Sequence, residues 1–211
     1  MSILQDRLRS DDTPVQLIGV GALPVDLPRA ERAVRELLIA LGENPDREGL
    51  AETPRRVAAS FAEQVLGLRS DPGRHLRRTF ANGGYDGVVI VRDIPFTSLC
   101  EHHLLPFHGK AHIAYLPRHG RVVGLSKLVR LVEGFARRPQ LQEQLTTQIM
   151  DTLIRHLDPA GAAVVIAAEH SCMSVRGTKV HGAQTRTALR RGAFVDQLPQ
   201  WPEVVGLITA P

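Results

Sequence analysis

The stretch of this sequence with the clearest potential for chemistry is Cys100-Glu101-His102-His103. The thiol of Cys100 and the imidazole of His103 stand three residues apart, a spacing typical of sites for soft or borderline metals. Cys172 is the second of the two cysteines and would complete a set of three ligands. Three protein ligands around zinc leave a fourth position for water, as in catalytic zinc sites. Two alternatives stay open: a pair of buried, apolar cysteines, or a Cys100–Cys172 disulfide.

Two further histidines belong near this group. His102 precedes the proposed ligand His103, and His170 lies two residues before Cys172. In an expected strand, residues two apart project from the same face, which would place His170 beside the metal. Imidazoles next to a metal-activated water can transfer protons. The pattern therefore favours hydrolytic chemistry, although each histidine is also compatible with an ordinary satisfied polar side chain.

A second group of polar residues is expected at the start of a helix. Ser126 is a good helix N-cap, and Lys127 and Arg130 then share one helix face. Cations are unfavourable at the positive end of the helix dipole unless an anion binds there, so the pattern predicts a phosphate site. Arg176, four residues after Cys172, adds a positive charge near the metal. The alternative is a solvated cationic face.

Gln142 and Glu143 fall in the first turn of a helix that is expected to begin at Pro139. An acidic residue at this position is favourable for the helix in itself. An amide beside a carboxylate also matches the edge of a guanine ring. Together, these groups predict a zinc hydrolase that acts on a phosphorylated, heteroaromatic substrate.

The elements that must position these residues follow from periodicity and from helix and strand boundaries. Helices are predicted over residues 29–41, from 53 onward, 127–137 and 139–157, a polar loop over 69–86, and strands over 87–96, 109–116, 121–125, 162–174 and 184–190. Without the short strand over 121–125, the order is helix, helix, strand, strand, helix, helix, strand, strand, which indicates an α+β fold with a mostly antiparallel sheet.

Composition excludes several classes of protein. The chain has 211 residues, of which 43% are hydrophobic and 23% charged, and two cysteines, which argues against disorder and against a disulfide scaffold. No apolar run is long enough for a membrane span, and the N-terminus lacks the apolar core of a signal peptide, so a cytoplasmic location is expected. A net charge of +4 with 4% aromatic residues and no basic run does not favour nucleic-acid binding.

The order and spacing of several motifs resemble the GTP cyclohydrolase I family over about residues 29–194. The motifs are Cys100-Glu101-His102-His103-Leu104, Pro106-Phe107, Gly109-Lys110, Gly124-Leu125-Ser126-Lys127, Arg138-Pro139-Gln140 with Gln142-Glu143, Glu169-His170, Cys172-Met173 and Arg176-Gly177. The Thr53-Pro54 segment with Arg56-Val57-Ala58 fits as well.

This resemblance implies the tunnelling fold (T-fold), with an antiparallel sheet, helices on one face and a barrel completed by oligomerisation. It also implies a homodecamer of two stacked pentamers with sites between subunits. The implied reaction is the zinc-dependent conversion of GTP to 7,8-dihydroneopterin triphosphate with release of formate, the first step of pterin and folate biosynthesis.

Matching positions imply the roles of individual residues. The zinc ligands would be Cys100, His103 and Cys172. The catalytic residues would be His102 and His170, which transfer protons after a zinc-bound water attacks C8 of the guanine, and Ser126, which contacts the ribose region. The substrate-binding residues would be Gln142 and Glu143 at the guanine and Lys127, Arg130 and Arg176 at the triphosphate.

The expected organisation has a leader (1–28), a family domain (29–195, with helices in 29–68 and the core in 87–195) and a C-terminal extension (196–211). Some family members carry a phosphate-binding lysine where this chain has Ala59. A non-catalytic paralogue that binds pterins or nucleotides is the alternative, but it has little reason to retain the complete Cys and His set. A purely structural zinc site is disfavoured because only three protein ligands are present.

Overall fold

The computed structural model describes residues 23–196, 202 and 204–206, so most of the expected leader and C-terminal extension lie outside the described residues. The elements are, in chain order, α1 (Leu27–Ala40), α2 (Thr53–Gln64), η2 (Leu66–Arg69), η3 (Pro72–Arg77), β1 (Thr79–Ala81), β2 (Val89–Cys100), β3 (Pro106–Leu116), β4 (Arg121–Val123), α3 (Leu125–Ala136), β5 (Pro139–Gln140), α4 (Gln142–Leu157), β6 (Gly161–His170), α5 (Ser171–Ser174), β7 (Gln184–Gly192) and α6 (Ala193–Asp196).

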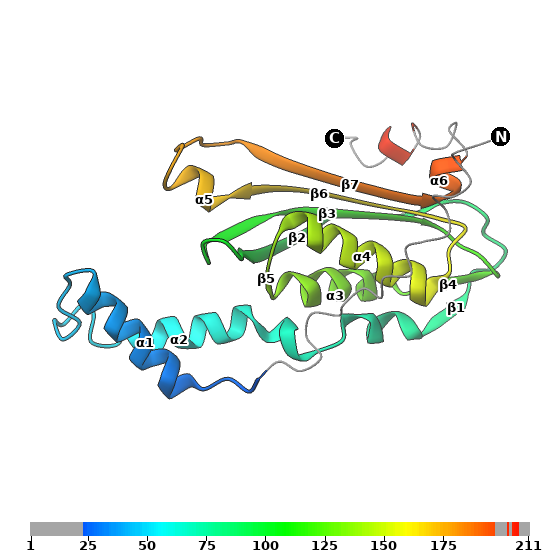
Figure 1. The fold of residues 1–211 in the computed structure, drawn as a ribbon. Helices are drawn as coiled ribbons and strands as arrows, with labels where there is room; N and C mark the ends of the chain where they lie inside the picture. The colour runs from blue at the N-terminus through cyan, green and yellow to red at the C-terminus, as the bar shows by residue number, and fades with distance from the viewer. Residues whose placement is uncertain (1–22, 197–201, 203, 207–211) are drawn as a thin grey trace, which may run out of the picture.

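The main sheet has five strands in the order β5-β2-β3-β6-β7 (Figure 1). All its pairs are antiparallel except the short β2–β5 pair, in which Leu99 and Cys100 lie opposite Pro139 and Gln140. β1 and β4 form a separate antiparallel pair. The prediction of an α+β fold with a mostly antiparallel sheet is therefore confirmed.

The core lies between the sheet and helices α3 and α4, which Figure 1 shows on the same side of the strands. Alternate residues of β3, such as Ala111 and Ile113, are fully buried beside Leu131 of α3 and Ile149 of α4. This alternation follows from the period of two in a strand. On the opposite face, α6 contributes Phe194 to a smaller buried cluster.

The first two helices form a hairpin at one side of the molecule (Figure 1). Asp26 caps α1 by accepting a hydrogen bond from the Arg29 backbone N–H at 3.0 Å, and proline occupies the first turn of both helices. None of the α1 side chains is fully buried. Among the described residues, no helix is long and apolar enough to cross a membrane.

Two predicted helix starts differ from the structure. Gly124, not Ser126, precedes α3 as its N-cap, because Leu125 is already helical. Pro139 does not begin a helix: it extends along β2 as β5, and the buried amide of Gln140 donates to Phe135 O at 2.6 Å. α4 therefore begins at Gln142, and Gln142 and Glu143 still occupy a first turn.

The predicted strand over residues 162–174 is too long. β6 ends at His170, and residues 171–174 form the short helix α5, which is followed by a hydrogen bond from Val175 N to Ser171 O at 2.9 Å. The expectation that His170 and Cys172 project from one strand face is therefore wrong. The predicted loop over residues 69–86 is also partly wrong, since it contains η3 and β1.

Arg138 anchors the segment around η2 and η3 to the core. Its guanidinium, with only 2% of the residue exposed, donates to Gly67 O at 2.9 Å and to Ser70 O at 3.2 Å. It also lies 4.8 Å from the centre of the Phe135 ring. Burial lowers the pKa of Arg138 from its usual value. One buried side chain thus holds two backbone carbonyls from a distant part of the chain.

We expect Arg138→Met to destabilise the protein by about 2–3 kcal/mol, because the carbonyls of Gly67 and Ser70 lose a charged donor. Arg137→Met is the matched control: Arg137 forms a partly exposed ion pair with Glu133 at 2.6 Å, and such pairs contribute less than about 1 kcal/mol. Urea unfolding at one fixed protein concentration measures both values. Equal losses in the two variants would contradict the anchoring role.

Candidate functional site

The hairpin between β2 and β3 brings Cys100 and His103 together. His103 N and Leu104 N both donate to the carbonyl of Cys100, at 3.3 and 2.8 Å, and Leu104 adopts a φ of 53°. This tight turn directs the His103 ring back over the end of β2. The Cys100 Sγ and His103 Nδ1 atoms are 3.8 Å apart.

Cys172 reaches the same place from the other side of β3. Phe107 at the start of β3 lies opposite Ser98 of β2 and His170 of β6, so the ends of β2 and β6 flank it. The turn of α5 then carries Cys172 to the group. The potential ligand atoms of Cys100, His103 and Cys172 lie within 4.8 Å of one another, as a shared metal ion requires.

The donor set fits a soft or borderline metal. Both cysteines are free thiols, Cys100 buried and Cys172 half-buried, while His103 is exposed. Burial raises the pKa of the Cys172 thiol, and the neighbouring Cys100 raises it further. A cation between the two sulfurs would oppose this effect by stabilising the thiolates. Two thiolates and an imidazole are ligands that zinc prefers.

His170 is held beside this group by two contacts. Its ring stacks on Phe107 with 4.6 Å between centroids and an interplanar angle of 1°. Its Nε2–H donates to Gln142 Oε1 at 2.8 Å. Burial lowers the pKa of His170, while the charge of Glu143 acts in the opposite direction. The ring is thus fixed in orientation and favoured in its neutral form.

The Gln142 side chain is fully engaged within the chain. Only 2% of the residue is exposed, and its Nε2 donates to Ile166 O at 3.2 Å and Thr185 O at 3.0 Å. Glu143, the next residue, is exposed at the start of α4. The two side chains therefore face different surroundings, which the sequence pattern did not predict.

His102 and Arg176 lie at the same end of the sheet as the Cys and His group. The exposed His102 ring is 6.2 Å from that of His103 in an edge-to-face arrangement. Arg176 Nη1 donates to His103 Nε2 at 3.0 Å. Arg176 is thus within reach of the proposed metal site, as its position after Cys172 predicts.

Ser126 and Lys127 lie toward the opposite end of the sheet. They follow β4, where the Val123 backbone N–H donates to the Tyr115 hydroxyl at 3.2 Å. Tyr115 is eight residues along β3 from Phe107, or roughly 27 Å at about 3.4 Å per residue. Arg130 is about one helical turn closer. A single chain therefore does not bring the start of α3 to the Cys and His group.

Sequence reasoning missed the contact of Phe107 with His170. Phe107 is fully buried and would be assigned to the core from its apolar character alone. Its role depends on the register between β3 and β6, in which it lies directly opposite His170. No local pattern reports that register.

The model of the GTP cyclohydrolase I family matches residues 30–209 of this chain. The chain belongs to this family. Proteins named GTP cyclohydrolase 1 are similar over most of their length. The protein from Carboxydothermus hydrogenoformans is 54% identical over 87% of this chain and 95% of its own length, and that from Pelotomaculum thermopropionicum is 55% identical over 87% and 97%. The protein from Rhodopirellula baltica is 56% identical over 87% of this chain and 80% of its own.

The GTP cyclohydrolase I match includes both halves of the Cys and His group, from the β2–β3 hairpin to α5. It also continues to residue 209 and so covers most of the expected C-terminal extension (196–211). Val204, within that segment, is 1% exposed and belongs to the cluster with Phe194.

Proposed function

We propose that this chain catalyses the GTP cyclohydrolase I reaction with a zinc ion bound by Cys100, His103 and Cys172. The observation that carries the proposal is the convergence of these three ligands beside a fixed, half-buried His170 in a chain of this family. A bound zinc ion supplies Lewis acidity and an activated water for hydrolysis. The product would be 7,8-dihydroneopterin triphosphate, with release of formate.

His170 and His102 are the proposed proton carriers. The neutral His170 ring donates from Nε2 to Gln142, so Nδ1 is free to accept a proton in that tautomer. Gln142 thereby fixes both the orientation and the tautomer of the ring. His102 is exposed and able to exchange protons with solvent.

Glu143 is the proposed acceptor for the donors on the guanine edge. Its carboxylate is exposed at the first turn of α4 and lies near enough to His170 to affect its pKa. The contact between Gln142 and the guanine remains a prediction. We propose that the Gln142 side chain also holds His170 in position. Burial of the Gln142 side chain supports that task.

Metal binding would release Arg176 for the substrate. A neutral imidazole that accepts from Arg176 through Nε2 carries its proton on Nδ1. An ion bound at Nδ1 requires the proton on Nε2, and two donors then face each other. The Arg176 guanidinium would turn away from His103, which leaves it available to a triphosphate oxygen.

The separation of Ser126 and Lys127 from the metal group supports a site shared between copies. If these residues contact the ribose region and triphosphate of the same GTP, a second subunit must supply them. We therefore propose the T-fold assembly of the family, in which residues 29–195 form the domain and edge strands of neighbouring copies join into a barrel. The exposed edge of β7 is suited to such pairing.

The purified protein, loaded with zinc and incubated with GTP, is expected to release one formate per GTP. After oxidation and dephosphorylation, the product should be fluorescent neopterin. Native mass measured on the same sample tests the decamer. A zinc-loaded, correctly assembled sample that binds GTP without releasing formate would contradict the catalytic proposal and favour a non-catalytic binding protein.

A further inference from the structure

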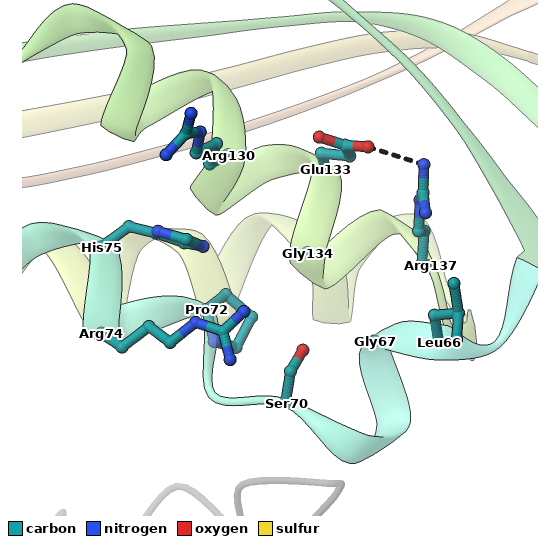
Figure 2. Close-up of a pocket in the computed structure, with 10 residues that line it drawn as sticks. All are labelled: Leu66, Gly67, Ser70, Pro72, Arg74, His75, Arg130, Glu133, Gly134 and Arg137. Atoms are coloured by element: carbon teal, nitrogen blue, oxygen red, sulfur yellow. Dashed lines mark hydrogen bonds and ion pairs between the residues drawn. The ribbon is translucent and has the colours of Figure 1, made fainter.

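A second polar cavity lies between η3 and α3, outside the Cys and His group (Figure 2). Its volume is about 390 Å³. Arg74 and His75 of η3 line it on one side, and Arg130 of α3 lines it on the other. The predicted loop over residues 69–86 gave no indication of a site here.

The cavity has an excess of positive charge. Glu133 and Arg137 both line the cavity, but they form an ion pair at 2.6 Å, so their charges cancel. Within the described part of the chain, no hydrogen bond or ion pair engages the side chain of Arg74 or Arg130. The excess charge on this wall therefore has no paired counterion among the described residues.

Lys127 adds to the positive charge that acts on His75, although it does not line the cavity. Burial lowers the pKa of His75, and repulsion from Arg74, Arg130 and Lys127 lowers it further. Asp71 acts in the opposite direction, but its carboxylate already accepts from Gly73 N at 2.9 Å and from Arg77 at 3.3 Å. The groups on η3 thus face the same cations that the proposed function assigns to the triphosphate.

The backbone beneath Arg74 and His75 is held rigidly. Arg138 fixes the preceding segment through the Gly67 and Ser70 carbonyls. Gly134 of α3 packs so closely on Pro72 that an added Cβ would lie 2.9 Å from the proline ring. These contacts hold the backbone of η3 against α3, which reduces the entropic cost of bringing its polar side chains to a ligand.

We propose that Arg74 and His75 bind the terminal phosphate of GTP together with Arg130. The inference rests on the proposed function, because Arg130 and Lys127 are assigned to the triphosphate there. A guanidinium forms charge-assisted, bidentate hydrogen bonds with phosphate oxygens, and a triphosphate offers more oxygens than Lys127, Arg130 and Arg176 can satisfy alone. Arg74 would make binding depend on the number of phosphates.

Arg74→Gln should raise the KM for GTP by about tenfold with little change in kcat, because a charge-assisted hydrogen bond contributes that much to binding. His75→Leu should raise KM by about threefold, as expected for the loss of a neutral donor. Arg77→Gln is the matched control: it lies on the same η3, pairs with Asp71 and does not line the cavity. Its KM should stay within about twofold of the wild type.

Inhibition by inorganic triphosphate tests whether the anion bound in the cavity is the triphosphate of GTP. It should compete with GTP in the wild type, and Arg74→Gln should weaken this inhibition by about the same factor as it raises KM. Unchanged KM and inhibition in Arg74→Gln would overturn the inference. Triphosphate that binds without competing with GTP would also overturn it, since the cavity would then hold a separate anion. A wild type that does not turn over GTP would instead contradict the proposed function.

Discussion

The Cys172→Ser variant should lose its metal ion and more than 99% of its GTP turnover, so that the rate of turnover falls by more than about 100-fold. A serine hydroxyl is close to a thiol in size but stays protonated near neutral pH, so it does not replace a thiolate as a zinc ligand. Only Cys100 and His103 would then remain. Replacing groups that merely support a metal ligand already costs about 10- to 100-fold, so losing a ligand should cost more.

Two measurements on the same sample test this expectation: metal content after dialysis, and formate release from GTP. Met173→Ser is the matched control, because Met173 is the exposed neighbour of Cys172 in α5 and should keep both properties. Titration of the metal-free wild type should detect two free thiols, which would exclude the disulfide alternative. A Cys172→Ser protein with full zinc and turnover would contradict the ligand assignment.

The helices and strands that bury one face could be predicted from the sequence. In α4, for example, Leu145, Ile149 and Leu153 recur every four residues, and all three are fully buried. In β3 the alternation of Ala111 and Ile113 with polar neighbours predicts the buried face correctly. A regular burial pattern leaves a regular sequence pattern, so these elements need no knowledge of their partners.

Elements that depend on distant contacts could not be predicted in the same way. η3 buries a single large side chain, Leu76, and is held by Arg138 and Gly134 from much later in the chain. β5 exists because Pro139 and Gln140 pair with the end of β2. In η3, tertiary contacts override a local preference for a loop. In β5, they override a local preference for a helix after proline.

The metal group was predictable in part. The spacing of Cys100 and His103 signals a pair of ligands, and the hairpin confirms that they meet. Cys172 could be predicted as the third ligand because the sequence has only two cysteines, although the strand geometry expected for it was wrong. The hydrogen bond between Gln142 and His170 joins α4 to β6 across 28 positions, and no local spacing reports such a contact.

His170→Ala should keep its zinc and lose turnover by about 10²- to 10⁴-fold, the usual contribution of a general acid or base. The reason lies in how the ring is held: Phe107 stacks on it and Gln142 accepts from it, so the fixed imidazole can act on substrate without being a ligand. His119→Ala, which removes an exposed histidine paired with Asp158, is the control and should leave turnover unchanged.

Metal content separates the two roles that His170 could have in this experiment. If His170→Ala loses zinc together with activity, the residue supports the metal rather than transferring protons. If zinc and turnover both stay at wild-type levels, the proton-transfer assignment is wrong. Formate and dihydroneopterin triphosphate should be measured separately, because the reaction continues after formate is released. A larger loss of the pterin than of formate would place His170 in the later proton transfers, whereas equal losses would place it at or before the release of formate.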